Sequence, residues 1–204
     1  PGERFLPLAE IRTDAVLSVD GAARLSSSEV DFAFVVWRSF PERLVGFAAR
    51  SHSWDAARRR WGSTAARANR FSMVLTDAAV YHRYYHSLFT HSLPPALREL
   101  VDGRAACEDV LMNLLVAAAT KLPPIKVTQR RELGEPGGQQ VGAGGGGTRP
   151  PAAGGSPPPH DCLDPLARWF GYMPLVSSQL RLDPVLFKDQ VSVLRKKYPR
   201  LEKP

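Results

Sequence analysis

Short apolar runs that suit strands alternate along this chain with helical patterns, and this alternation limits the fold more than any other feature. The run over 15–19 ends at Asp20-Gly21, the pattern of a buried strand that delivers a polar residue to a loop. Serine side chains at 26–28 can cap the apolar helix that the sequence predicts over 29–38. Alternation of this kind predicts an α/β fold with a mainly parallel sheet flanked by helices.

The clearest helix is predicted over 107–119, where apolar residues recur at helical spacing and Glu108 and Asp109 occupy the first turn. Two prolines after Leu122 stop this helix. The polar segment over 50–70 carries Trp54 and Trp61 among arginines and indicates a surface loop or hairpin that faces a ligand. Weaker patterns predict strands over 44–48, 71–75 and 125–128, and helices over 78–89 and from about 163.

The length of 204 residues fits one globular domain. Glycine and proline dominate the segment over 132–160, which cannot bury enough apolar side chain to offset the entropy of ordering it. We therefore expect a disordered loop inside a single domain that spans 1–204.

The net charge of +7 favours polyanionic partners, although basic residues that merely keep the surface soluble would give the same value. Short basic clusters lie at 58–60, 130–131 and 195–197, and none is joined to a nucleic-acid-binding motif. We expect no nucleic-acid partner.

Cys107 and Cys162 are the only two cysteines. They fit either one long-range disulfide in a secretory compartment or two reduced thiols, and neither has a partner at zinc-ligand spacing. No apolar run of about 18 residues is present, and the N-terminus lacks the layout of a signal peptide. We expect any targeting sequence to lie upstream of this chain.

Many blocks of the sequence resemble the exostosin family of heparan sulfate glycosyltransferases. The resemblance covers nearly all of the chain outside the glycine- and proline-rich segment. The matching blocks are 4–7, 13–20, 25–26, 28–34, 39–46, 72–76, 81–82, 84–85, 107–109, 112–113, 121–129, 169–175 and 181–197.

The resemblance implies a nucleotide-diphospho-sugar transferase fold of the GT-A type, of which the N-terminal part is missing, so that 1–204 is one partial glycosyltransferase domain. It also implies that N-acetylglucosamine moves from UDP-N-acetylglucosamine to the terminal glucuronic acid of a heparan sulfate-type chain, forming an α1,4 bond with retention. The implied setting is the lumen of the endoplasmic reticulum and Golgi, in a single-pass type II membrane protein whose anchor lies outside this chain.

The resemblance also implies the roles of individual residues. Asp109 corresponds to the carboxylate beside the anomeric carbon of the donor, with Arg4, Asp20 and Glu108 in contact with substrate. An Asp-x-Asp loop at Asp20 would hold Mn²⁺ on the donor diphosphate, because this hard cation prefers carboxylate oxygens. Here Ala22 stands where relatives have the ligating acid, and its methyl group cannot bind a cation.

A disulfide between Cys107 and Cys162 is implied as well. Two further departures are Ala106, where relatives carry an asparagine, and Pro159, where relatives carry an arginine. These departures favour an alternative hypothesis, a weakly active or inactive member that serves as a glycan-binding or regulatory subunit of an active exostosin. A third hypothesis is a general polyanion-binding module.

Overall fold

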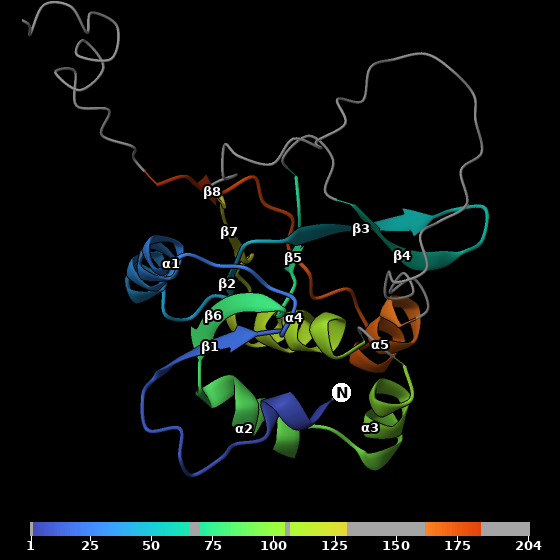
Figure 1. Ribbon diagram of the computed structural model, residues 1–204. Helices are drawn as coiled ribbons and strands as arrows, with labels where there is room; N and C mark the ends of the chain where they lie inside the picture. Colours follow the sequence, from blue (N-terminus) through green and yellow to red (C-terminus); the bar gives the residue numbers. More distant parts are fainter. Residues whose placement is uncertain (1, 66–69, 105–106, 130–161, 185–204) are drawn as a thin grey trace, which may run out of the picture.

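The computed structural model describes residues 2–65, 70–104, 107–129 and 162–184 (Figure 1). The elements in chain order are the 3-10 helix η1 (Gly2–Phe5), β1 (Ala15–Val19), α1 (Ser27–Ser39), β2 (Val45–Gly46), β3 (Ala49–Asp55), β4 (Arg60–Ala65), β5 (Met73–Val74), β6 (Ala78–His82), α2 (Tyr84–His91), α3 (Pro95–Asp102), α4 (Cys107–Thr120), β7 (Ile125–Val127), α5 (Leu163–Phe170) and β8 (Arg181–Leu182).

The main sheet has five strands in the order β1-β6-β2-β7-β8 and is mixed rather than mainly parallel. Strand β6 pairs antiparallel with both β1 and β2, whereas β2–β7 and β7–β8 are parallel pairs. The α/β class is therefore confirmed, and the expectation of a mainly parallel sheet is wrong. The error lies in the predicted helix over 78–89, whose first part is the strand β6 and whose second part is α2.

Alternate side chains of β6 explain why these residues form a strand. Val80 packs against α1, while Ala79 and Tyr81 join the core on the opposite face of the sheet. All three side chains are buried, so tertiary packing on both faces overrides the helical pattern of the aromatic residues that follow.

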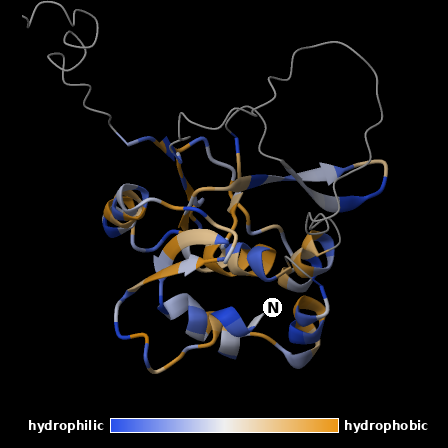
Figure 2. Cartoon of the chain, in the orientation of Figure 1, coloured by the Kyte–Doolittle hydropathy of each residue, from blue (hydrophilic) through white to orange (hydrophobic). Residues whose placement is uncertain are grey.

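Helices cover both faces of this sheet. Helix α1 begins with a capping box between Ser26 and Glu29. Trp37 of α1 belongs to a core cluster that includes residues of β2, β6 and β7. The opposite face is covered by the apolar helix α4, against which α2 and α3 pack (Figures 1 and 2). The predicted helix over 107–119 is confirmed as α4.

A second, antiparallel sheet has the order β4-β3-β5, so the segment over 50–70 contains the hairpin that the sequence predicts. The two sheets approach closely at Gly46 of β2. A Cβ atom there would lie 2.9 Å from Cβ of Val74 in β5, so only glycine permits this approach.

Strand β1 is not the buried strand that its apolar run predicts. It lies at the edge of the main sheet, and the side chains of Leu17 and Val19 are 40% and 46% exposed. The predicted disordered loop over 132–160 lies outside the described residues, so that prediction and the single-domain prediction remain untested. No helix within the described ranges is long and apolar enough to span a bilayer.

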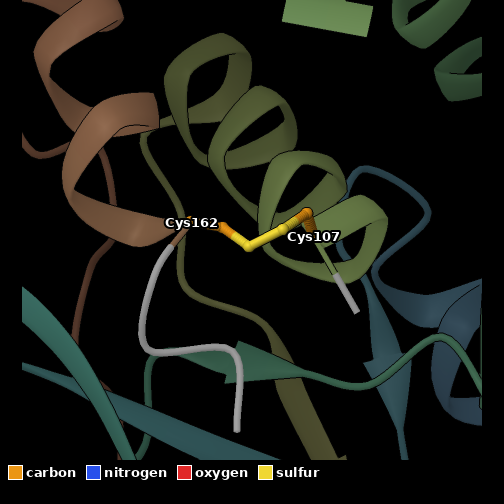
Figure 3. Close-up of a disulfide and its surroundings, with 2 residues drawn as sticks. All are labelled: Cys107 and Cys162. Carbon is orange, nitrogen blue, oxygen red and sulfur yellow. A yellow bond between two sulfur atoms is a disulfide. The ribbon is translucent and has the colours of Figure 1, made fainter. Parts of the chain in front are cut away.

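The structure contains the disulfide that the family resemblance implies (Figure 3). It joins Cys107, the first residue of α4, to Cys162, which directly precedes α5, with 5.6 Å between the Cα atoms. Both cysteines are buried in the same core cluster as the apolar residues of α4. The bond therefore fixes the start of α4, where the candidate catalytic acids lie, against the start of α5.

Replacing both cysteines, Cys107→Ser with Cys162→Ser, should lower the free energy of unfolding by about 4 kcal/mol, because the bond closes a loop over a sequence separation of 55. Urea denaturation of the two proteins measures the difference. A reducing agent should destabilise only the native protein, and equal stability of the native and double-serine proteins would show that the disulfide does not constrain the chain.

Candidate functional site

Polar residues that follow two strands meet the first turn of α4. Asp20 follows β1, Thr76 lies between β5 and β6, and Asp109 belongs to α4. The backbone amide of Thr76 donates a hydrogen bond to Oδ1 of Asp109 over 2.9 Å, and the Thr76 hydroxyl donates to the same oxygen. The amide of Asp20 donates to the backbone carbonyl of Asp77 over 2.8 Å. These bonds hold both acids at one edge of the sheet.

Arg4 of η1 connects the two acids. Its guanidinium forms an ion pair with the carboxylate of Asp20, and its Nη1 donates to Oγ1 of Thr76 over 3.3 Å. The side chains of Arg4 and Asp20 are 25% and 46% exposed, so both can be reached by a ligand. A continuous polar chain therefore runs from Asp20 through Arg4 and Thr76 to Asp109.

Asn113, one helical turn after Asp109, fixes the distance between β5 and α4. Its buried amide accepts a hydrogen bond from the backbone N–H of Val74 over 3.0 Å and donates one to the carbonyl of Val74 over 2.7 Å. It also donates to the backbone carbonyl of Asp109 over 2.8 Å. The strand that leads to Thr76 is thus bonded directly to the helix that carries Asp109.

Asp77 and Glu108 are two further acids at this site, and each has a carboxyl oxygen without a hydrogen-bond partner among the described residues. Burial raises the pKa of Asp77, and the neighbouring charge of Asp109 raises it further. Burial also raises the pKa of Glu108, again with a contribution from Asp109. Both groups therefore hold a proton more readily than a solvated carboxyl.

The structure brings together three residues that the family resemblance singled out, Arg4, Asp20 and Asp109. Glu108 lies beside Asp109, and no described hydrogen bond links its side chain to Arg4 or Asp20. Their roles with substrate remain predictions.

The sequence patterns single out neither Thr76 nor Asn113, and they offer Asp77 only as an acid that could replace the ligand missing at Ala22. A signal was present for Asn113, because it is a polar residue on the apolar face of a predicted helix, where a buried amide must find partners. Thr76 and Asp77 follow a short apolar run, and polar residues at strand ends are candidates for ligand contact.

The residues present do not fit the Mn²⁺ site that the resemblance implies. Ala22 supplies no ligand atom, and the carboxylate of Asp20 is already paired with Arg4. Across the described parts of the chain, no three His, Cys, Asp or Glu residues are grouped so that they could hold a metal ion. We derive no chemical step through a metal.

Helices on both faces of a mixed sheet, with acids near the strand ends, fit a GT-A-like domain. Residues 2–187 match the Glycosyl transferase family 64 domain, and the chain belongs to this family. The resemblance to exostosins noted in the sequence is thereby confirmed.

Curated relatives give the same result. The chain is 62% identical over 207 residues to Exostosin-like 1 from Homo sapiens, which covers 99% of this chain and 29% of that protein. It is 56% identical over 200 residues to Exostosin-1 from Bos taurus, covering 98% of the chain and 26% of the relative. It is 54% identical over 200 residues to Exostosin-1b from Danio rerio, covering 98% of the chain and 27% of the relative. The chain thus spans under a third of the length of these relatives.

The substitution Asp77→Asn should stabilise the protein at neutral pH. A carboxyl group whose pKa is raised by folding binds protons more tightly in the folded state, so its ionisation destabilises the fold as the pH rises. Below the ordinary Asp pKa of about 4 this destabilisation is absent. Urea denaturation at several pH values should show that the variant gains stability relative to native protein as the pH increases. Asp31→Asn, at an exposed position of α1, is the control and should leave the pH dependence unchanged.

The substitution Ala22→Asp should increase the affinity for Mn²⁺, because it restores a second carboxylate near Asp20. Titration followed by electron paramagnetic resonance measures the loss of the free Mn²⁺ signal. Ala22→Asn, which adds bulk without charge, should bind the ion more weakly than Ala22→Asp. Tight Mn²⁺ binding by the native protein, unaffected by either change, would show that the carboxylates already present suffice.

Proposed function

We propose that this chain forms part of an enzyme that transfers N-acetylglucosamine from UDP-N-acetylglucosamine to the terminal glucuronic acid of heparan sulfate-type chains, with retention and an α1,4 linkage. The observation that supports this proposal is the polar chain that joins Arg4, Asp20, Thr76 and Asp109 at a ligand-accessible edge of the sheet. The proposed reaction belongs to heparan sulfate and heparin proteoglycan biosynthesis. Membership of the glycosyltransferase family supplies the reaction class.

Asp109 is the proposed catalytic residue. Positive charge develops at the anomeric carbon as the bond to the diphosphate breaks, and a carboxylate beside that carbon stabilises it. The amide and hydroxyl of Thr76 both donate to Oδ1 of Asp109, which leaves Oδ2 available to face the sugar. Oδ2 would also accept a hydrogen bond from the acceptor hydroxyl and orient it. Thr76 acts as a positioning residue in this scheme.

Arg4 and Asp20 are the proposed contacts to the nucleotide sugar, with Glu108 as a further substrate contact. The guanidinium of Arg4 carries a permanent positive charge that pairs well with phosphate oxygens. Because it is paired with Asp20 in this structure, donor binding requires the guanidinium to share its donors between the carboxylate and the diphosphate. We place the enzyme in the lumen of the endoplasmic reticulum and Golgi as a type II membrane protein.

A second candidate function is that of a glycan-binding or regulatory subunit of another exostosin. Ala22 favours it, because the loop lacks the second acid of the Asp-x-Asp pattern and the diphosphate loses a cation that would stabilise its departure. The departures at Ala106 and Pro159 point the same way but lie outside the described residues.

The substitution Asp109→Asn should reduce transfer by about a hundredfold or more, because it removes the charge that stabilises the transition state. The measurement is incorporation of labelled N-acetylglucosamine into an oligosaccharide that ends in glucuronic acid, with the protein at its full natural length. Parallel reactions with Mn²⁺ and with EDTA establish whether transfer requires a metal.

Asp31→Asn serves as the matched control, since it removes an equal charge from an exposed helix position and should retain full activity. Activity that survives Asp109→Asn would exclude Asp109 as the catalytic residue. Absence of transfer by the native protein, beside an active exostosin, would favour the subunit function.

A further inference from the structure

The β3–β4 hairpin carries an unusual concentration of positive charge and aromatic side chains. Its residues over 49–65 include four arginines, one aspartate and two tryptophans. Arg58 and Arg59 lie in the turn between the strands, and Arg60 is the first residue of β4. Figure 2 shows much of the hairpin in the colours of hydrophilic residues. The proposed catalytic step does not involve this hairpin.

Trp54 and Trp61 are cross-strand partners with different surroundings. Their ring centroids lie 5.3 Å apart in an edge-on arrangement. Trp61 packs against the core, and its backbone amide donates to Asp164 of α5 over 3.0 Å. Trp54 remains 50% exposed. One indole therefore anchors the hairpin, and the other is presented to solvent, where its flat apolar surface can stack on a sugar ring.

The backbone of Arg59 adopts a conformation that is unfavourable for an arginine. Its φ of 49° lies in the left-handed region, where glycine or asparagine is much better accommodated. The Arg59 side chain is exposed and forms no ion pair with any described residue. Its neighbour Arg58 is 70% exposed and pairs only loosely with Asp55, at 3.6 Å. The two guanidinium groups are thus available to an external anion.

The hairpin is also linked to the candidate catalytic acid. The hydrogen bond from Trp61 to Asp164 ties β4 to the start of α5, and the disulfide ties the start of α5 to Cys107, two residues before Asp109. A chain-like ligand whose end lies at Asp109 can therefore extend towards a hairpin held in a fixed position.

We propose that the tip of the β3–β4 hairpin binds an anionic oligosaccharide, with Trp54 stacking on a sugar ring and with Arg58 and Arg59 pairing with its carboxylate or sulfate groups. This inference rests on the proposed function in one respect, that the oligosaccharide is the acceptor chain. Arginine suits the role because its planar fork pairs with such anions through two parallel hydrogen bonds.

The test is calorimetric titration with a heparin-derived hexasaccharide, without any donor, over a series of salt concentrations. Arg59→Asn should weaken binding by about threefold or more and make its salt dependence shallower, because one guanidinium contact is lost. The same change should leave the thermal midpoint unchanged or raise it, because asparagine tolerates the left-handed conformation. Arg38→Asn, an exposed arginine on α1, is the matched control and should have little effect.

Trp54→Leu should also weaken binding, and Trp54→Phe should retain part of the affinity because it keeps an aromatic face. The proposal is overturned if Arg59→Asn and Arg38→Asn weaken binding equally, since net charge alone would then explain it. It is also overturned if Trp54→Leu binds as tightly as native protein, or if single-stranded DNA of equal charge competes equally well.

Two readouts on the same proteins, hexasaccharide binding without donor and transfer of labelled sugar, separate this inference from the proposed function. Native protein that binds at the hairpin but transfers no sugar would refute the enzyme and leave the binding surface in place. Arg59→Asn and Trp54→Leu variants that transfer sugar and still bind the hexasaccharide with the affinity of native protein would refute the binding surface and leave the proposed enzyme in place.

Discussion

The buried amide of Asn113 takes the place of a neighbouring strand beside β5. One edge of β5 pairs with β3, and at the other edge both backbone groups of Val74 bond to the Asn113 side chain. An unpaired buried backbone group costs about 1–3 kcal/mol, so this arrangement is strongly specified. It sets the second sheet on α4, and it brings Thr76, two residues beyond Val74, to the carboxylate of Asp109. The rest of the site depends on this contact.

The charged side chains of the site include one arginine and several acids that lie near it. Burial raises the pKa of Asp77 and of Glu108, and the charge of Asp109 is a further cause of both shifts. Arg4 pairs with Asp20 and donates to Thr76, and its positive charge partly offsets the raised pKa of Asp77 and of Glu108. A diphosphate approaching this edge would meet a guanidinium already engaged by Asp20. Under the proposed function, the Arg4 guanidinium has to share its hydrogen-bond donors between Asp20 and the diphosphate.

Local sequence patterns predict the helices whose apolar residues recur at helical spacing. They fail where strand pairing with residues far away in the sequence determines the secondary structure. Helix α4 follows from leucines at helical spacing and a proline stop, and α1 from its serine cap. Strand β6 was assigned to a helix because the aromatic residues after it mimic helical spacing, and its antiparallel pairing on both sides depends on residues far away in the sequence. The short helix α3 was missed, although Pro95 at its start suits a first helical turn. At the site, Arg4, Asp20 and Asp109 came from the family resemblance, whereas the positioning contacts of Thr76 and Asn113 required the fold.

The disulfide at the start of α4 has a consequence for how freely this sequence can vary. Strand β7 fixes the chain at Val127, and Cys162 is fixed again by its bond to Cys107. Because both ends are held by contacts of their own, the positions of α4 and α5 depend on these two points and not on how many residues separate them in sequence. Changes of length between Val127 and Cys162 are therefore expected to leave the candidate catalytic edge in place.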